Sequence, residues 1–297
     1  MERIIARYTT GEAGPLVFIT AAVHGNEPSG VHALEEVFTQ LRAADAKIKG
    51  TVIGLRGNLK ALQNGMRYID EDLNRTWIKD KIEKTFHETR EEIQMMEIIE
   101  VLDSELDNHK GEKTYFLDCH TTSSESVPYM SVQVKGDNDP WAHKFPTYIV
   151  RGFSDMVNGS IDHYFTDRGL TGFTFEAGQH DDPDSQRHHQ SMIWLILEQA
   201  CDLDLNSIAT YPKCVESLKT DAPDQKTFEI SHRHEIKKAD DFKMKPGFEN
   251  FQKISKGELL AHSNGEEIIS TWDAYIFMPL YQGQGNDGFF VIEEVTS

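Results

Sequence analysis

The stretch PLVFITAAVHGNEPSG, residues 15–30, decides the fold. Its first nine residues are an apolar run typical of a buried strand, and HGNEP then breaks the run with a Gly/Asn/Pro turn. Pro28 stands near the first turn of a helix that follows. The apolar stripe of this helix consists of Val31, Leu34 and Val37. A buried strand that turns into an amphipathic helix is half of a βαβ unit, so we expect an α/β fold.

The same rhythm continues downstream. Long amphipathic helices are predicted over 85–107 and from the Asp182-Pro183 pair to about 203. The apolar face of the first is predicted to hold Ile93, Met96, Ile99, Leu102 and Leu106. Further strands are predicted over 51–57, 114–119, 129–136 and 172–178.

The pattern changes near Pro212. Short strand-like pieces then alternate with Gly, Asn and Lys turns, and no convincing helix follows. We therefore predict a catalytic domain over 1–212, with a mixed central sheet flanked by helices, and a small β-rich C-terminal domain over 213–297.

Composition limits the possible functions. The hydrophobic fraction is 38% and the charged fraction 27%, which is typical of a soluble globular protein. The net charge of −19 argues against nucleic acid or an anionic membrane as a partner. The N-terminus lacks a signal-peptide core and the three cysteines are not in CxxC spacing, so we expect a cytoplasmic protein with free thiols. The sequence is compatible with a homo-oligomer.

Two separate segments predict a metal site. His24 and Glu27 lie three residues apart where the first strand ends, and His120 ends a second apolar run, TYFLDCH. Ligands in open α/β sheets bind at the carboxyl ends of strands. Two imidazoles and a carboxylate are a three-ligand zinc set that leaves a position for water, so these residues predict one zinc ion per chain and hydrolysis.

Strand alternation distinguishes the neighbours of His120. Cys119 faces the opposite side of the strand, which favours buried packing over metal binding. Asp118 shares the side of His120 and is a candidate to orient an imidazole. The remaining histidine pairs do not lie beside a carboxylate at a strand end and are set aside: His188-His189 and His232/His234.

Two further segments carry groups for substrate and catalysis. The loop MRYIDEDLNRTW, residues 66–77, places Arg67, Asn74 and Arg75 among acidic and apolar residues. The arginines could supply paired donors for a carboxylate or an oxyanion, which the strongly negative chain would otherwise lack. Glu176 lies in the apolar run GFTFEAG, where a carboxylate is costly unless it is paired or functional, so it is a candidate general base.

HGNEPSG, RYIDEDLNR, DCHTT and FEAG occur here in an order and spacing that resemble the succinylglutamate desuccinylase/aspartoacylase family, a branch of the zinc carboxypeptidase superfamily. The resemblance extends to GxGNDGFF at 283–290. It implies zinc ligation by His24, Glu27 and His120, with Glu176 as general base and proton shuttle. It also implies that Arg67 polarises the scissile carbonyl.

For substrate binding, the resemblance implies that Asn74 and Arg75 hold an α-carboxylate, with further contacts from Tyr164, Arg168 and Tyr281. The expected substrate is a small anionic N-acyl amino acid, similar to N-acetylaspartate or N-succinylglutamate. Two alternatives remain from the sequence. One is a metallocarboxypeptidase acting on peptides, and the other is a non-catalytic zinc-dependent binding protein.

Overall fold

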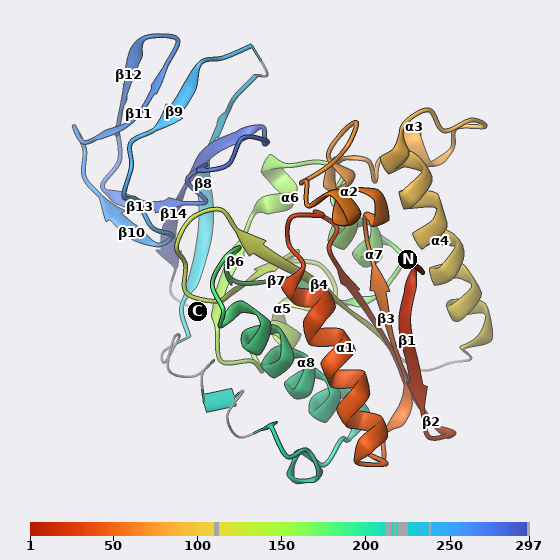
Figure 1. Cartoon of the computed structure of the whole chain (residues 1–297). Helices are drawn as coiled ribbons and strands as arrows, with labels where there is room; N and C mark the ends of the chain where they lie inside the picture. The colour runs from red at the N-terminus through yellow and green to blue at the C-terminus, as the bar shows by residue number, and fades with distance from the viewer. Residues whose placement is uncertain (110–112, 212–214, 217, 219–224, 238, 296–297) are drawn as a thin grey trace.

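The computed structural model describes residues 1–109, 113–211, 215–216, 218, 225–237 and 239–295 (Figure 1). Its larger helices are α1 (Ser29–Ala43), α4 (Arg90–Asn108) and α8 (Ser185–Cys201). The shorter ones are α2 (Leu59–Asn64), η1 (Leu73–Arg75), α3 (Lys79–Ile82), α5 (Asn138–Ala142), α6 (Phe153–Met156), α7 (Ile161–Asp167) and η2 (Leu205–Ser207).

Eleven of the described strands form one mixed sheet, in the order β1-β3-β2-β4-β7-β5-β6-β8-β14-β13-β10. The first seven of these in the sheet order are β1 (Ile4–Thr9), β3 (Lys49–Arg56), β2 (Glu12–Ala21), β4 (Thr114–Thr122), β7 (Thr171–Gln179), β5 (Tyr129–Val132) and β6 (Tyr148–Arg151). The central strands β3, β2, β4 and β7 are parallel, whereas β5 runs antiparallel to β7. The predicted mixed sheet flanked by helices is confirmed.

The two faces of the sheet are covered by different helices. Val17 and Ile19 of β2 pack in one apolar core with α1 and α8, which lie side by side in Figure 1. Leu16 and Phe18, which point the other way, pack in a second core with α4 and α7. Cys119 belongs to the first core, so the prediction that it packs opposite His120 is confirmed.

Helix α4 differs from the prediction in start and rotation. It begins at Arg90 because Thr89 caps it by accepting a hydrogen bond from the Glu92 backbone N–H. The prediction that Ile93 lies on the buried face is wrong, since its exposed fraction is 46%. The buried apolar residues are Met95, Ile98, Ile99 and Leu102.

A buried carboxylate explains this rotation. Glu91 Oε1 accepts hydrogen bonds from the Asn58 side chain at 2.9 Å and from the Ile69 backbone N–H at 2.8 Å. Glu91 Oε2 accepts from the backbone N–H groups of Asp70 at 3.1 Å and Glu71 at 3.3 Å. The polar start of α4 is therefore turned inward, where it anchors the loop over 66–77.

The C-terminal part is rich in strands, as predicted, and extends the main sheet. Strand β8 (Thr227–Glu235) pairs in parallel with β6 and antiparallel with β14 (Asp287–Val295). Strands β13 (Ala274–Phe277) and β10 (Gln252–Ile254) complete the edge. A second sheet consists of β12 (Glu266–Ile269), β11 (Leu259–Ser263) and β9 (Phe242–Met244), seen in blue away from the helices in Figure 1.

The predicted domain boundary at 212/213 lies outside the described residues. The division into two domains therefore stays a prediction. None of the helices in the described ranges has the length and apolar character that crossing a membrane requires.

Candidate active site

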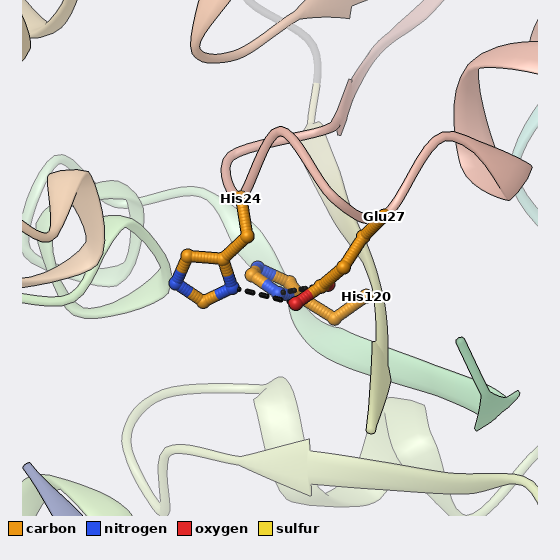
Figure 2. Close-up of side chains that lie close together, drawn as sticks. All are labelled: His24, Glu27 and His120. Carbon is orange, nitrogen blue, oxygen red and sulfur yellow. Dashed lines mark hydrogen bonds and ion pairs between the residues drawn. The ribbon is translucent and has the colours of Figure 1, made fainter. Parts of the chain in front are cut away.

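Three buried side chains converge where β2 and β4 end (Figure 2). His24 Nδ1 lies 2.9 Å from Glu27 Oε1, and His120 Nδ1 lies 3.1 Å from Glu27 Oε2. One donor atom from each residue lies within 4.8 Å of the others, so the group could hold a metal ion. Because β2 and β4 are parallel neighbours, their carboxyl ends bring these distant segments together.

The far nitrogen of each imidazole faces a carboxylate. His24 Nε2 lies 3.0 Å from Asp72 Oδ1, and His120 Nε2 lies 2.8 Å from Asp118 Oδ2. Asp118 is held in turn by the Thr20 hydroxyl, which donates to Oδ1 at 2.6 Å. A carboxylate that accepts the Nε2 proton leaves the Nδ1 lone pair free for a metal, so both imidazoles fit the ligand role.

The group attracts a cation. Burial lowers the pKa of His120, but Asp118 and Glu27 outweigh it and raise this pKa well above its usual value. For Glu27, burial acts to raise the pKa, and the neighbouring His24 and His120 hold it well below its usual range. A metal ion at Nδ1 would replace the protons held there, which couples metal binding to pH.

Glu176 lies beside this group. It is opposite His120 in the parallel register of β7 and β4, and its side chain lines the same cavity. Burial raises the pKa of Glu176 to about 8. Its Oε2 is buried without a hydrogen-bond partner among the described residues. A carboxyl group held in this way is equipped to take up a proton from a reacting group.

The loop over 66–77 supplies the cations. Arg67 Nη2 donates to Asp72 Oδ2 at 3.0 Å, and its Nη1 lies 3.6 Å from Glu27 Oε1. Arg75 Nη2 donates to Asp287 Oδ2 at 2.9 Å. Asn74 Oδ1 accepts from the Ile161 backbone N–H at 2.9 Å, which ties the loop to α7.

A cavity with about 520 Å³ of empty space, part of it open to solvent, unites these groups. Met278 reaches it from the C-terminal part, so the wall is built from both ends of the chain. The lining residues are His24, Arg67, Asn74, Arg75, His120, Ser131, Phe153, Val157, Ser160, Asp162, Thr174, Glu176 and Met278.

The structure does not bring Tyr164, Arg168 or Tyr281 into this cavity. Tyr164 packs against Trp77 with ring centroids 5.3 Å apart, and its hydroxyl accepts from Arg168 Nη1 at 2.7 Å. Helix α7 turns its other face, with Asp162, to the cavity, because two residues along a helix rotate by about 200°.

Tyr281 lies on the surface, with an exposed fraction of 39%. Its hydroxyl donates to the Lys245 carbonyl at 2.8 Å and accepts from the Phe248 backbone N–H at 2.9 Å. Neither Lys245 nor Phe248 lines the cavity. A substrate contact from Tyr281, Tyr164 or Arg168 therefore stays a prediction that this geometry does not support.

Sequence reasoning missed three acidic residues of this region. Asp72, Asp162 and Asp287 are read as solvated charges when only their local sequence is considered. Asp287 lies within the GxGNDGFF element, whose position far from the other motifs gives no sign of the Arg75 contact. Asp72 could have been found from the sequence, because it is one of the acidic residues inside RYIDEDLNR, next to the predicted arginines.

Comparison with known proteins shows the family of this chain. The family model described as "Succinylglutamate desuccinylase/Aspartoacylase catalytic domain" matches residues 13–190. The chain belongs to this family. A succinylglutamate desuccinylase from Shewanella pealeana is 26% identical over 273 residues, covering 84% of this chain and 73% of the relative. A protein named "Probable aspartoacylase" from Nostoc is 29% identical over 133 residues, 45% of this chain and 43% of the relative.

Solved structures of family members share the fold. A succinylglutamate desuccinylase/aspartoacylase from Rhodobacter sphaeroides has a TM-score of 0.68 at 18% identity and covers 96% of this chain and 87% of that one. The succinylglutamate desuccinylase from Chromobacterium violaceum has a TM-score of 0.65 at 15% identity and covers 100% and 95%. Membership of this family indicates a hydrolase of the deacylase type.

Proposed function

We propose that this protein is a zinc-dependent amidohydrolase that removes the acyl group from a small N-acyl amino acid. The observation that carries the proposal concerns Glu176, which lines the same cavity as His24 and His120. Its Oε2 is buried and has no hydrogen-bond partner in the part of the chain that the structure describes. A buried carboxyl group beside a possible metal site, with an oxygen free to take up a proton, favours catalysis over binding alone.

The metal would be held by His24 Nδ1, a Glu27 carboxylate oxygen and His120 Nδ1. A zinc ion at these ligands supplies Lewis acidity, which lowers the pKa of water and polarises a carbonyl group. Asp72 and Asp118 keep the imidazoles oriented through their Nε2 atoms.

The remaining steps fall to side chains of this chain. Glu176 takes the proton of the attacking water and returns it to the leaving amine. Arg67, fixed by Asp72, donates to the oxygen of the scissile carbonyl as negative charge develops there. Arg75 and Asn74 hold the α-carboxylate, which positions the amide for attack.

The wall of the cavity favours small molecules over peptides, because Met278 from the C-terminal part lines the cavity together with residues from the first half of the chain. The test is acyl release from a panel of N-acetyl and N-succinyl amino acids and from short peptides, with zinc-loaded protein. Release from N-acyl amino acids alone supports the proposal, whereas cleavage of peptides alone would assign a carboxypeptidase.

A further inference from the structure

A buried carboxylate in the cavity wall has no place in the mechanism above. Asp162, in the first turn of α7, has an exposed fraction of 4% and lines the cavity. Its Oδ2 accepts a hydrogen bond from the neutral amide Nε2 of Gln133 at 2.7 Å. No ion pair involves Asp162 within the described part of the chain.

The cations of the cavity do not compensate this charge. Arg67 is paired with Asp72 at 3.0 Å, and Arg75 is paired with Asp287 at 2.9 Å. The N-terminus of the short helix α7 offers only a partial positive charge. A buried carboxylate is costly unless a cation pairs with it, and here the remaining place for a cation is the cavity itself.

Strand register locates Asp162 relative to the base. Thr174 of β7 pairs with Ser131 of β5. Thr174 precedes Glu176 by two residues, so the side chains of Thr174 and Glu176 lie on the same face of the sheet. This pair lies about 7 Å from the Glu176 position along the strand. Gln133, which holds Asp162, follows Ser131 by two residues, so Asp162 lies toward the end of the cavity away from Glu176.

The same end of the cavity belongs to the amino-acid half of the substrate. Asn74 accepts from the backbone N–H of Ile161, the residue before Asp162. The proposed carboxylate anchor and Asp162 are therefore joined at the start of α7. A group that reaches Asp162 while the α-carboxylate is held by Asn74 and Arg75 belongs to the side chain of the amino acid.

We propose that Asp162 is a specificity-determining residue that binds a cationic side chain of the substrate. The preferred substrates are then N-acyl derivatives of diamino acids, whose side-chain ammonium group donates to Asp162, in place of N-acyl aspartate or glutamate. This inference rests on the proposed deacylase function. It differs from the anionic side chain that the sequence resemblance implies.

The first test compares three substrates of similar size with zinc-loaded full-length protein: Nα-acetyl-L-ornithine, Nα-acetyl-L-glutamine and Nα-acetyl-L-glutamate. We expect the ornithine derivative to have a kcat/KM at least about 10-fold above the glutamine derivative, with the glutamate derivative lowest. Asp162→Asn should cost the ornithine derivative about 30-fold and the glutamine derivative only a few-fold. Preference for the glutamate derivative, or equal losses on both, would overturn the inference.

A matched control is available on the same helix. Asp167, at the end of α7, pairs with Lys135 on the surface, and Asp167→Asn should leave the order of the substrates unchanged. If Asp167→Asn reproduces the effect of Asp162→Asn, the carboxylate acts through helix stability and the specificity role is wrong.

A second readout is independent of turnover and of the acyl group. Calorimetric titration of the zinc-loaded protein with free L-ornithine, L-glutamine and L-glutamate should give the tightest binding for L-ornithine, lost in Asp162→Asn. Acyl release without this preference would contradict the inference and leave the deacylase function standing. The preference without acyl release from any substrate would support the role of Asp162 and contradict the deacylase function.

Discussion

Asp287 bridges Arg75 and Arg233 from the start of β14. Its Oδ2 accepts from Arg75 Nη2 at 2.9 Å, and its Oδ1 accepts from Arg233 Nε at 2.6 Å. Arg75 comes from the loop over 66–77, while Asp287 belongs to the C-terminal GxGNDGFF element. The C-terminal part therefore fixes the position of a cavity arginine as well as extending the sheet.

This bridge predicts that Asp287→Asn weakens substrate binding. Without the charge of Asp287, the Arg75 guanidinium can move away from the position in which it would bind the substrate α-carboxylate. A small displacement of a binding group costs a large part of its effect. We expect KM to rise by about 10-fold or more, while zinc content stays unchanged. Steady-state kinetics and metal analysis check this. Asp241→Asn, an exposed residue of the same part, is the control, and an unaltered KM in Asp287→Asn would contradict the account.

Arg75→Ala should separate carboxylate recognition from a structural role. A paired arginine and carboxylate in a partly buried site contribute about 2–5 kcal/mol when one partner is truncated. This corresponds to a loss in kcat/KM of about 30-fold or more on an N-acyl amino acid. Its α-carboxamide should be affected far less, and Arg75→Lys should recover little. An equal loss on both substrates would show that Arg75 does not read the carboxylate.

Removing an imidazole should remove the metal. His24→Ala and His120→Ala each delete one of three proposed ligands, so we expect zinc content and activity to be lost together while the fold persists. Metal analysis after dialysis and circular dichroism measure both. His262→Ala, on the exposed face of β11, should retain zinc. One tightly bound zinc per chain in His120→Ala would show that the ligand set is wrong.

Much of this architecture follows from local sequence. Hydrophobic runs located β2, β4 and β7. The carboxyl ends of the first two located His24 and His120, because parallel strands present those ends at one edge, and the cost of a charge inside an apolar run located Glu176. The alternation of side chains separated Asp118 from Cys119 correctly, since that rule needs no partner from elsewhere in the chain.

The features that the sequence did not predict depend on contacts between residues far apart in the chain. The rotation of α4 follows from Glu91 binding the 69–71 backbone, which hydrophobic periodicity cannot detect. Tyr164 lies on the outer face of α7 because Asp162 takes the cavity side, and the family resemblance alone did not fix that rotation. The pairing of β6 with β8 joins segments whose sequences carry no sign of one another.

A buried histidine outside the cavity predicts acid sensitivity. Burial lowers the pKa of His189 from 6.5 to about 3, and neither ring nitrogen has a partner among the described residues. Between these values the unfolded chain binds a proton that the native chain does not, so stability falls as the pH falls. This group contributes a slope of up to about 1.4 kcal/mol per pH unit. Urea unfolding between pH 4 and 7 should show a shallower slope for His189→Leu, and equal slopes would contradict the assignment.

The central claim is that Glu176 activates water beside a zinc ion held by His24, Glu27 and His120. Glu176→Gln keeps the size of the side chain and removes its ability to accept a proton. The most direct measurement is therefore zinc content and single-turnover acyl release, wild type against Glu176→Gln, on the best N-acyl amino acid substrate. We predict one zinc per chain in both proteins and a rate that falls by about 10²–10⁴-fold or more in the variant. A wild-type rate in zinc-loaded Glu176→Gln would contradict the account.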